Sequence, residues 1–182
     1  MGMYYFFETN NNYKSEKQFP YVLSYFFEQI GGYDDKSVIV QLEKILEIDF
    51  SIFQNTYFDD ADFEFDEFLD EETRKSIENS KNVNWIKIEE IQNVVLEFIE
   101  KSKIAKDYFS KVIFSTDEDD EKLRGMNYSE SLKYEEENPN CFYPVNNSIL
   151  SKENIENGFL EINEIMNEFK NNEVKELRLR YD

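Results

Sequence analysis

Residues 151–181, SKENIENGFLEINEIMNEFKNNEVKELRLRY, carry the clearest secondary-structure pattern in the chain. Ser151 is suited to cap a helix, and apolar side chains then recur on one helical face. These side chains are Ile155, Phe159, Ile162, Met166 and Phe169. After Asn171 and Asn172 the pattern changes to the alternation of a strand, in which Leu177, Leu179 and Tyr181 alternate with Arg178 and Arg180. The stretch predicts a long amphipathic helix followed by a C-terminal strand.

At the other end of the chain, residues 3–8 are dense in aromatic side chains, which favours a second strand. A polar stretch that contains Asn10, Asn11 and Asn12 follows it as a loop. We expect the first and last strands to pair in a small sheet. Arg178 and Arg180 share one face of their strand, with Lys175 nearby. Because the chain is very acidic, we expect these three bases to pair internally rather than to bind phosphate.

The residues between these strands contain three further apolar stripes at helical spacing. The stripes are Val22, Leu23, Phe26, Phe27 and Ile30; Val38, Leu42, Ile45 and Leu46; and Ile88, Ile91, Val95, Phe98 and Ile99. We expect Gly31-Gly32 to end the first helix and Asp34 or Asp35 to cap the second. The third stripe either continues or restarts in the residues that follow it, which are Ile104, Tyr108, Val112 and Ile113. An acidic run, Asp117–Glu121, comes next, and the polar stretch that follows it to Pro144 is expected to be the least regular part of the chain.

The fold predicted from these patterns is α+β and mostly helical, with about five helices and a small sheet that pairs the N- and C-terminal strands. A length of 182 residues with 40% hydrophobic side chains fits a single domain spanning 1–182. The central region at about 59–137 is the acidic part of that domain. It holds 24 acidic and 11 basic residues, which is −13 of the total net charge of −20.

Two acidic runs within this region are the candidate binding surface. In the run at 59–72, apolar Ala61, Phe63 and Phe65 alternate with acids, so an extended chain would present one row of carboxylates. This row either faces a basic partner or belongs to a solvated loop or edge strand that its Phe residues hold in place. The predicted partner-binding residues are Asp59, Asp60, Asp62, Glu64, Asp66, Glu67, Asp70, Glu71, Glu72, Asp117, Glu118, Asp119, Asp120 and Glu121.

The catalytic side chains expected of most enzyme classes are scarce. The chain has no His, which removes the usual general base and the nucleophile–His pairs. With 5 Gly it lacks a phosphate-binding loop, and Phe65 and Lys122 occupy the positions where a calcium loop needs Gly. Cys141 has no visible base to activate it. We therefore predict a protein that is not an enzyme and needs no cofactor or metal, although a carboxylate- or metal-dependent hydrolase stays an alternative among 40 acids.

The acidity favours a basic protein as partner and disfavours nucleic acid and anionic membranes. One cysteine and the absence of a signal-peptide pattern predict a cytoplasmic protein. The leading hypothesis is an acidic inhibitor that blocks the active site of a basic toxin such as a nuclease. In size, acidity and lack of motifs the chain resembles the immunity proteins, or antitoxins, of bacterial toxin systems. The second hypothesis is a DNA mimic that inhibits a nucleic-acid-binding defence enzyme.

Overall fold

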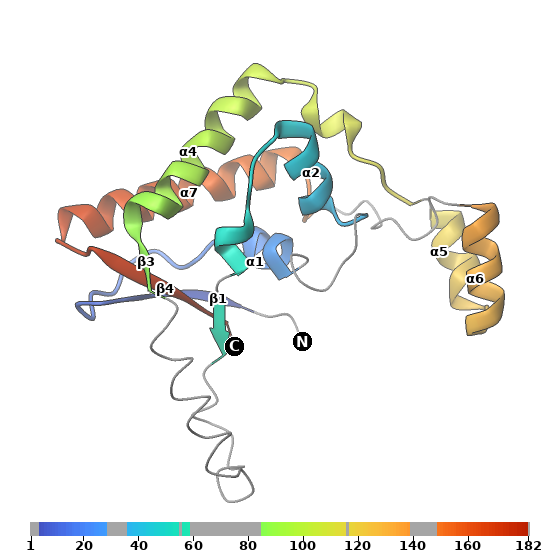
Figure 1. The fold of residues 1–182 in the computed structure, drawn as a ribbon, viewed down its shortest axis with the longest axis horizontal. Coiled ribbons are helices and arrows are strands. Elements are labelled where there is room, and N and C mark those ends of the chain that lie inside the picture. Colours follow the sequence, from blue (N-terminus) through green and yellow to red (C-terminus); the bar gives the residue numbers. More distant parts are fainter. Residues whose placement is uncertain are drawn as a thin grey trace, which may run out of the picture.

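The fold is α+β and mostly helical, as predicted (Figure 1). The computed structural model describes residues 4–28, 36–54, 56–58, 85–115, 117–138 and 149–181. The α-helices of this part are α1 (Tyr21–Glu28), α2 (Val38–Leu46), α4 (Ile88–Ile104), α5 (Asp117–Arg124), α6 (Tyr128–Glu137) and α7 (Lys152–Asn171). Two 3₁₀ turns, η1 (Ser51–Gln54) and η4 (Tyr108–Lys111), accompany them. The strands are β1 (Tyr5–Thr9), β2 (Thr56–Phe58), β3 (Ile86–Lys87) and β4 (Glu176–Tyr181).

The C-terminal strand β4 is the centre of the sheet. β1 pairs with it antiparallel on one side, with Phe7 opposite Leu179, so the predicted pairing of the first and last strands is confirmed. On its other side β4 pairs with β2 in parallel and with β3 antiparallel. Leu177 and Leu179 are fully buried, because alternate residues of β4 face the helices.

The arginines of β4 lie on the opposite face of the strand. Arg178 donates two hydrogen bonds to the Glu8 carboxylate of β1, at 2.9 and 2.8 Å, which confirms the internal pairing expected for it. Its guanidinium also lies 4.9 Å from the centre of the Trp85 ring. The Arg180 guanidinium lies 5.3 Å from the centre of the Phe6 ring, and Phe6 stands directly opposite Arg180 in the β1–β4 register.

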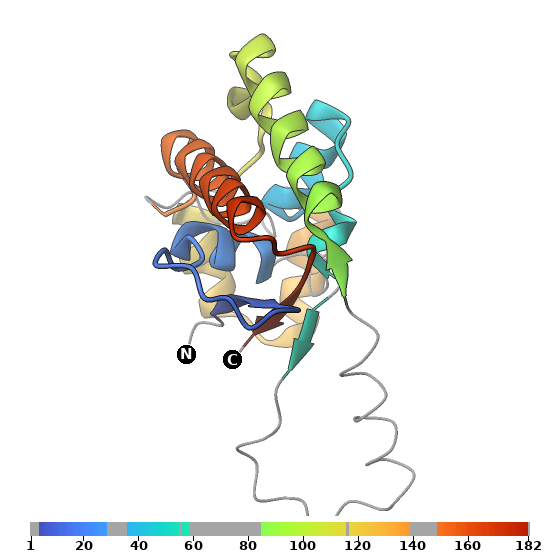
Figure 2. The ribbon, with the colours of Figure 1, turned by 90° about the vertical axis from the view of Figure 1, so that its left-hand side faces the viewer.

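Helices α1, α4 and α7 cover one face of this sheet, and α7 crosses it next to α4 (Figure 2). The core between them is largely aromatic. The ring of Phe159 in α7 is stacked at 4.0 Å on Phe98 of α4 and lies 5.6 Å from Phe50 and 6.2 Å from Phe26 of α1. The apolar stripe predicted for α7 is the stripe that is buried, from Ile155 to Phe169.

Two details of the predicted helices are wrong, and the structure also shows whether the apolar stripe of α4 continues beyond the helix. α2 is capped by Ser37, whose hydroxyl accepts from the Val40 N–H at 3.3 Å, rather than by Asp34 or Asp35. The stretch after Glu121, expected to be irregular, contains the end of α5 and the whole of α6. The apolar stripe of α4 does not continue into the following segment, because the helix ends at Ile104 before the separate turn η4.

Candidate functional site

The predicted binding residues fall into two groups. Those of the first acidic run lie outside the described residues: Asp59, Asp60, Asp62, Glu64, Asp66, Glu67, Asp70, Glu71 and Glu72. Those of the second run all lie on helix α5: Asp117, Glu118, Asp119, Asp120 and Glu121. The structure therefore places the second run on a regular element, which joins α6 to form the candidate binding surface of this protein.

The charge order of α5 explains why so acidic a segment is helical. Its acids come first in the helix, and negative charge in the first turn is favoured by the partial positive charge of the helix N-terminus. Lys122 and Arg124 occupy the last turn, at the negative end. Lys122 also lies one turn after Glu118 and bonds its carboxylate at 2.7 Å, a bond that raises the pKa of Lys122.

Helix α6 begins with a capping box. The Asn127 side chain accepts from the backbone N–H groups of Ser129 and Glu130, both at 3.1 Å. In return the Glu130 carboxylate accepts from the Asn127 backbone N–H at 2.9 Å. Because this reciprocal pair satisfies N–H groups that have no partner within the helix, it fixes the start of α6 without any tertiary packing.

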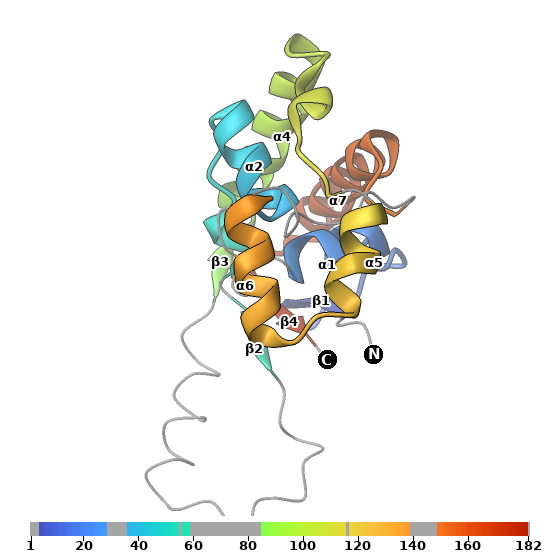
Figure 3. The ribbon, with the colours of Figure 1, turned by 90° about the vertical axis from the view of Figure 1, so that its right-hand side faces the viewer.

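The two helices form the α5–α6 hairpin, residues 117–137, and lie side by side (Figure 3). The Tyr134 hydroxyl of α6 donates to the Asp119 carboxylate of α5 at 2.9 Å. This hydrogen bond raises the pKa of Tyr134, because the adjacent carboxylate disfavours a phenolate. Lys122 lies 5.8 Å from the centre of the Tyr134 ring, so one tyrosine contacts both an acid and a base of α5.

Polar contacts attach the hairpin to the rest of the molecule. Between η4 and the hairpin, the backbone N–H and carbonyl of Ile113 bond the buried side chain of Gln41 at 2.7 and 3.0 Å. Lys36, whose carbonyl also bonds Gln41, forms a 2.6 Å ion pair with Glu135 of α6. Within the described part of the chain, the hydrophobic core contains no residue of the hairpin, which lies at one end of the molecule in Figure 1.

The exposed face of α6 combines charge with two apolar side chains. Tyr128 is 78% exposed and Leu132 is 43% exposed, and their spacing of four residues places them on one face of the helix. Nine acids and three bases give residues 117–137 a net charge of −6. An exposed tyrosine beside a leucine in so acidic a hairpin can bind a partner surface that is both basic and apolar.

The patterns considered for the sequence did not identify Tyr128 or Leu132. The signal that could have found them is the box Asn127-Tyr128-Ser129-Glu130, which marks a helix start. Once α6 is placed from that box, the spacing of the two apolar residues puts them on one exposed face. Among 40 acids spread over the sequence, the longest acidic runs are a stronger signal than this short box.

Within residues 4–28, 36–54, 56–58, 85–115, 117–138 and 149–181, no group of three metal-ligating side chains could hold an ion. Among the described helices none has the length and apolarity needed to span a membrane. Comparisons with protein-family models, with curated proteins and with solved structures found no match to this chain.

Proposed function

We propose that this protein is an acidic, protein-binding inhibitor that docks on a basic protein through the α5–α6 hairpin. The observation that carries the proposal is a helical hairpin outside the core that combines a net charge of −6 with the exposed side chains of Tyr128 and Leu132. Neither apolar side chain contributes to the core. A basic partner with a small apolar recess supplies both kinds of complementarity at once.

Charge and apolar surface contribute to different steps of this docking. The negative charge of the hairpin accelerates encounter with a basic protein, and this effect weakens as salt screens it. Tyr128 and Leu132 then supply contact area that is removed from water, and tyrosine is among the residues that most often dominate interface energies. Because the capping box and the Tyr134–Asp119 bond order the hairpin before binding, less conformational entropy is lost on association.

The specific partner that we propose is a basic toxin such as a nuclease, which the protein inhibits by covering the active site. Sites that bind nucleic acid are rich in lysine and arginine, so they complement an acidic hairpin. An inhibitor of this kind needs no catalytic groups of its own. The proposed role is that of the immunity proteins and antitoxins to which the chain is similar in size and charge.

The test compares two full-length variants that each reverse two exposed glutamates. The hairpin variant is Glu136→Lys/Glu137→Lys at the end of α6, where lysines also suit the negative helix terminus. The matched control is Glu90→Lys/Glu100→Lys on α4, which changes the net charge equally. The unmodified chain is used to capture proteins from nuclease-treated lysate, and the captured proteins are identified and purified. Calorimetry then measures their affinity for the unmodified chain, the hairpin variant and the α4 control.

We expect one basic protein that binds the unmodified chain and the α4 control equally, but binds the hairpin variant at least about tenfold more weakly. A second variant, Tyr128→Ala/Leu132→Ala, should weaken binding with little change in the association rate, because it removes contact area and not charge. Equal affinity for the hairpin variant and the control would contradict the proposed surface. Loss of the partner's toxic activity in the complex tests the inhibitor role separately.

The acidic segment at 59–72 stays a predicted contribution to the same surface. Reversal of Asp60, Asp62, Glu64 and Asp66 in one variant tests it against the same purified partner. A loss of affinity beyond that of the hairpin variant would assign the segment to the interface. Unchanged affinity, with an unchanged unfolding transition, would restrict the interface to the α5–α6 hairpin.

A further inference from the structure

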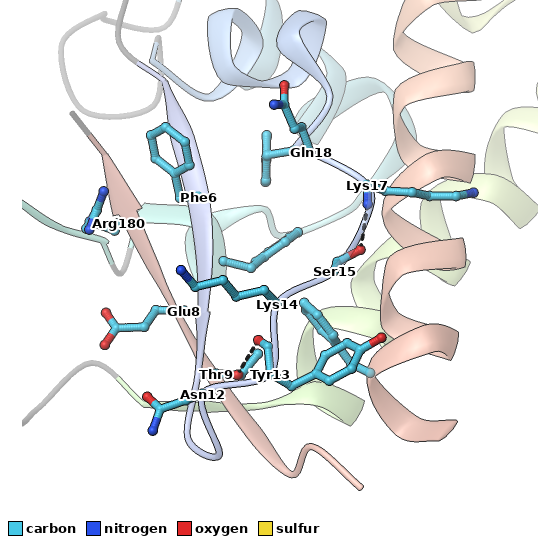
Figure 4. A pocket seen from close by; sticks show the side chains of 13 residues that line it. Phe6, Glu8, Thr9, Asn12, Tyr13, Lys14, Ser15, Lys17, Gln18 and Arg180 are labelled. Carbon is cyan, nitrogen blue, oxygen red and sulfur yellow. Dashed lines mark hydrogen bonds between the residues drawn. The ribbon is translucent and has the colours of Figure 1, made fainter. Parts of the chain in front are cut away.

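A pocket of about 380 Å³ lies beside strand β1, away from the α5–α6 hairpin. After Thr9 the chain turns and returns past β1, and the pocket lies between β1 and this return segment, residues 12–19 (Figure 4). The turn is held by the Thr9 hydroxyl, which donates to the Tyr13 carbonyl at 2.7 Å. The volume falls within the range of roughly 300–1,000 Å³ that small-molecule sites occupy.

Part of the pocket wall is aromatic. Phe7 of β1 lies with its ring 5.0 Å from that of Phe19 and 5.9 Å from that of Phe169 in α7. Phe19 and Phe169 are buried and belong to the core, so these two walls are fixed by the fold. A planar apolar group placed against these rings would gain aromatic contacts without first ordering the protein.

The backbone of Phe7 adds a hydrogen-bonding edge to this aromatic wall. Asn10 N–H donates to Glu176 of β4 at 3.1 Å, whereas Tyr5 N–H points the other way and donates to the Ser24 hydroxyl at 3.2 Å. Because backbone groups alternate along a strand, the N–H and C=O of Phe7 point with those of Tyr5, away from β4. Among the described strands none pairs with this edge of β1.

The charged groups around the pocket leave a positive charge at its mouth. The Glu168 carboxylate accepts from the hydroxyls of Tyr13 and Ser15, both at 2.8 Å, and Lys17 pairs with Glu164. Lys14 is exposed, and its side chain extends from the return segment toward β1 (Figure 4). Within the described residues Lys14 forms no ion pair. An ammonium in this position is notable in a chain of net charge −20.

We propose that this pocket binds a small aromatic carboxylate. The ring of the ligand packs on Phe7, Phe19 and Phe169, and its carboxylate accepts from the Lys14 ammonium and the Phe7 N–H. Such charge-assisted hydrogen bonds are stronger than neutral ones. Ring and charge together set the specificity, because a small anion without a ring gains only the contact with the ammonium, whereas an aromatic carboxylate also gains the aromatic contacts.

The test is a titration of the ¹⁵N-labelled full chain with 2-naphthoate, followed by amide chemical shifts. Neutral 2-naphthamide and inorganic phosphate serve as matched probes, since one keeps only the ring and the other only the charge. We expect saturable shifts at Phe7 and along residues 12–19 with naphthoate. Naphthamide should bind about tenfold more weakly, and phosphate should cause no saturable shift there.

Two lysine variants separate the pocket from general charge effects. Lys14→Gln should weaken naphthoate binding about tenfold, whereas Lys103→Gln on α4 should leave it unchanged, because both positions are exposed and only Lys14 lines the pocket. Glu136→Lys/Glu137→Lys should also leave it unchanged, which keeps this site distinct from the hairpin. No saturable shift with naphthoate, equal binding of naphthamide or phosphate, or equal binding by Lys14→Gln would each overturn the proposal.

Discussion

At Gly158, in the middle of α7, the absence of a side chain lets α1 approach closely. A Cβ added there would lie 2.7 Å from Leu23 Cγ and 3.0 Å from Val22 Cγ1. Leu23 is fully buried, and the near atom is not at the free end of its side chain. We expect Gly158→Ala to lower the free energy of unfolding by about 1–3 kcal/mol, because overpacking outweighs the gain of about 1 kcal/mol in helix propensity. Urea unfolding measures this change.

Gly125, which follows α5, provides the matched control. A Cβ there would meet only the Lys122 carbonyl, at an ordinary contact distance of 3.6 Å, and no glycine of the described part has a positive φ. Gly125→Ala should therefore change stability by less than about 1 kcal/mol, in the stabilising direction. If the two substitutions had equal effects, the α1–α7 contact would not be the reason for glycine at position 158.

At the scale of elements, Glu168 ties the return segment to α7. Desolvation raises the pKa of this carboxyl, but the hydrogen bonds from Ser15 and Tyr13 lower it more, so it lies below the usual 4.5. Because folding lowers this pKa, the ionised carboxylate stabilises the folded protein at pH values above the pKa of the unfolded state. This stability is lost as the pH falls through the pKa of the folded state. We expect Glu168→Gln to be less stable than the unmodified protein at pH 7.

The pH dependence of unfolding distinguishes this role of Glu168 from a simple loss of charge. Between about pH 5 and pH 2, the stability of Glu168→Gln should fall less steeply than that of the unmodified protein. The control is Glu161→Gln, on the same helix and exposed, which removes a charge but no hydrogen bond among the described residues. Parallel pH profiles for the unmodified protein and Glu168→Gln would show that the carboxylate does not stabilise the return segment.

The α5–α6 hairpin should open more easily than the helices of the core. Its contacts are helix caps, ion pairs and hydrogen bonds near solvent, and α6 has no buried residue. Local opening therefore costs less free energy than unfolding of α4 and α7. By native-state hydrogen exchange, we expect amides of residues 119–137 to exchange roughly 100-fold faster than those around Phe159. Equal protection would mean that the hairpin unfolds only with the core.

The elements that the sequence predicted correctly are those with one buried face, because a buried face makes apolar residues recur at regular spacing along the sequence. Leu177 and Leu179 alternate with arginines because one face of β4 is buried, and the α7 stripe recurs because α7 crosses the core. α5 and α6 bury no such stripe, so hydrophobic spacing could not reveal them. Only their ends carried a signal, in the capping box at Asn127. The pocket beside β1 depends on tertiary contacts such as Phe7 with Phe169, which no local pattern encodes.

For the whole molecule, the net charge of −20 makes salt act on folding and on the proposed binding in opposite directions. Like charges oppose the compact state, so screening them stabilises it. Raising NaCl from about 0.02 M to 0.5 M shortens the Debye length from roughly 20 Å to 4 Å. We expect this change to increase the free energy of urea unfolding by about 1 kcal/mol or more.

The same increase in salt should weaken binding of the basic partner, mainly through a lower association rate, because screening removes the attraction that steers encounter. Glu136→Lys/Glu137→Lys should show a smaller salt dependence of association than Glu90→Lys/Glu100→Lys, although both carry the same net charge. Stopped-flow association at several salt concentrations measures this difference. Equal salt slopes would mean that overall charge steers the partner. A smaller slope for the hairpin variant alone would mean that attraction is concentrated at α5–α6.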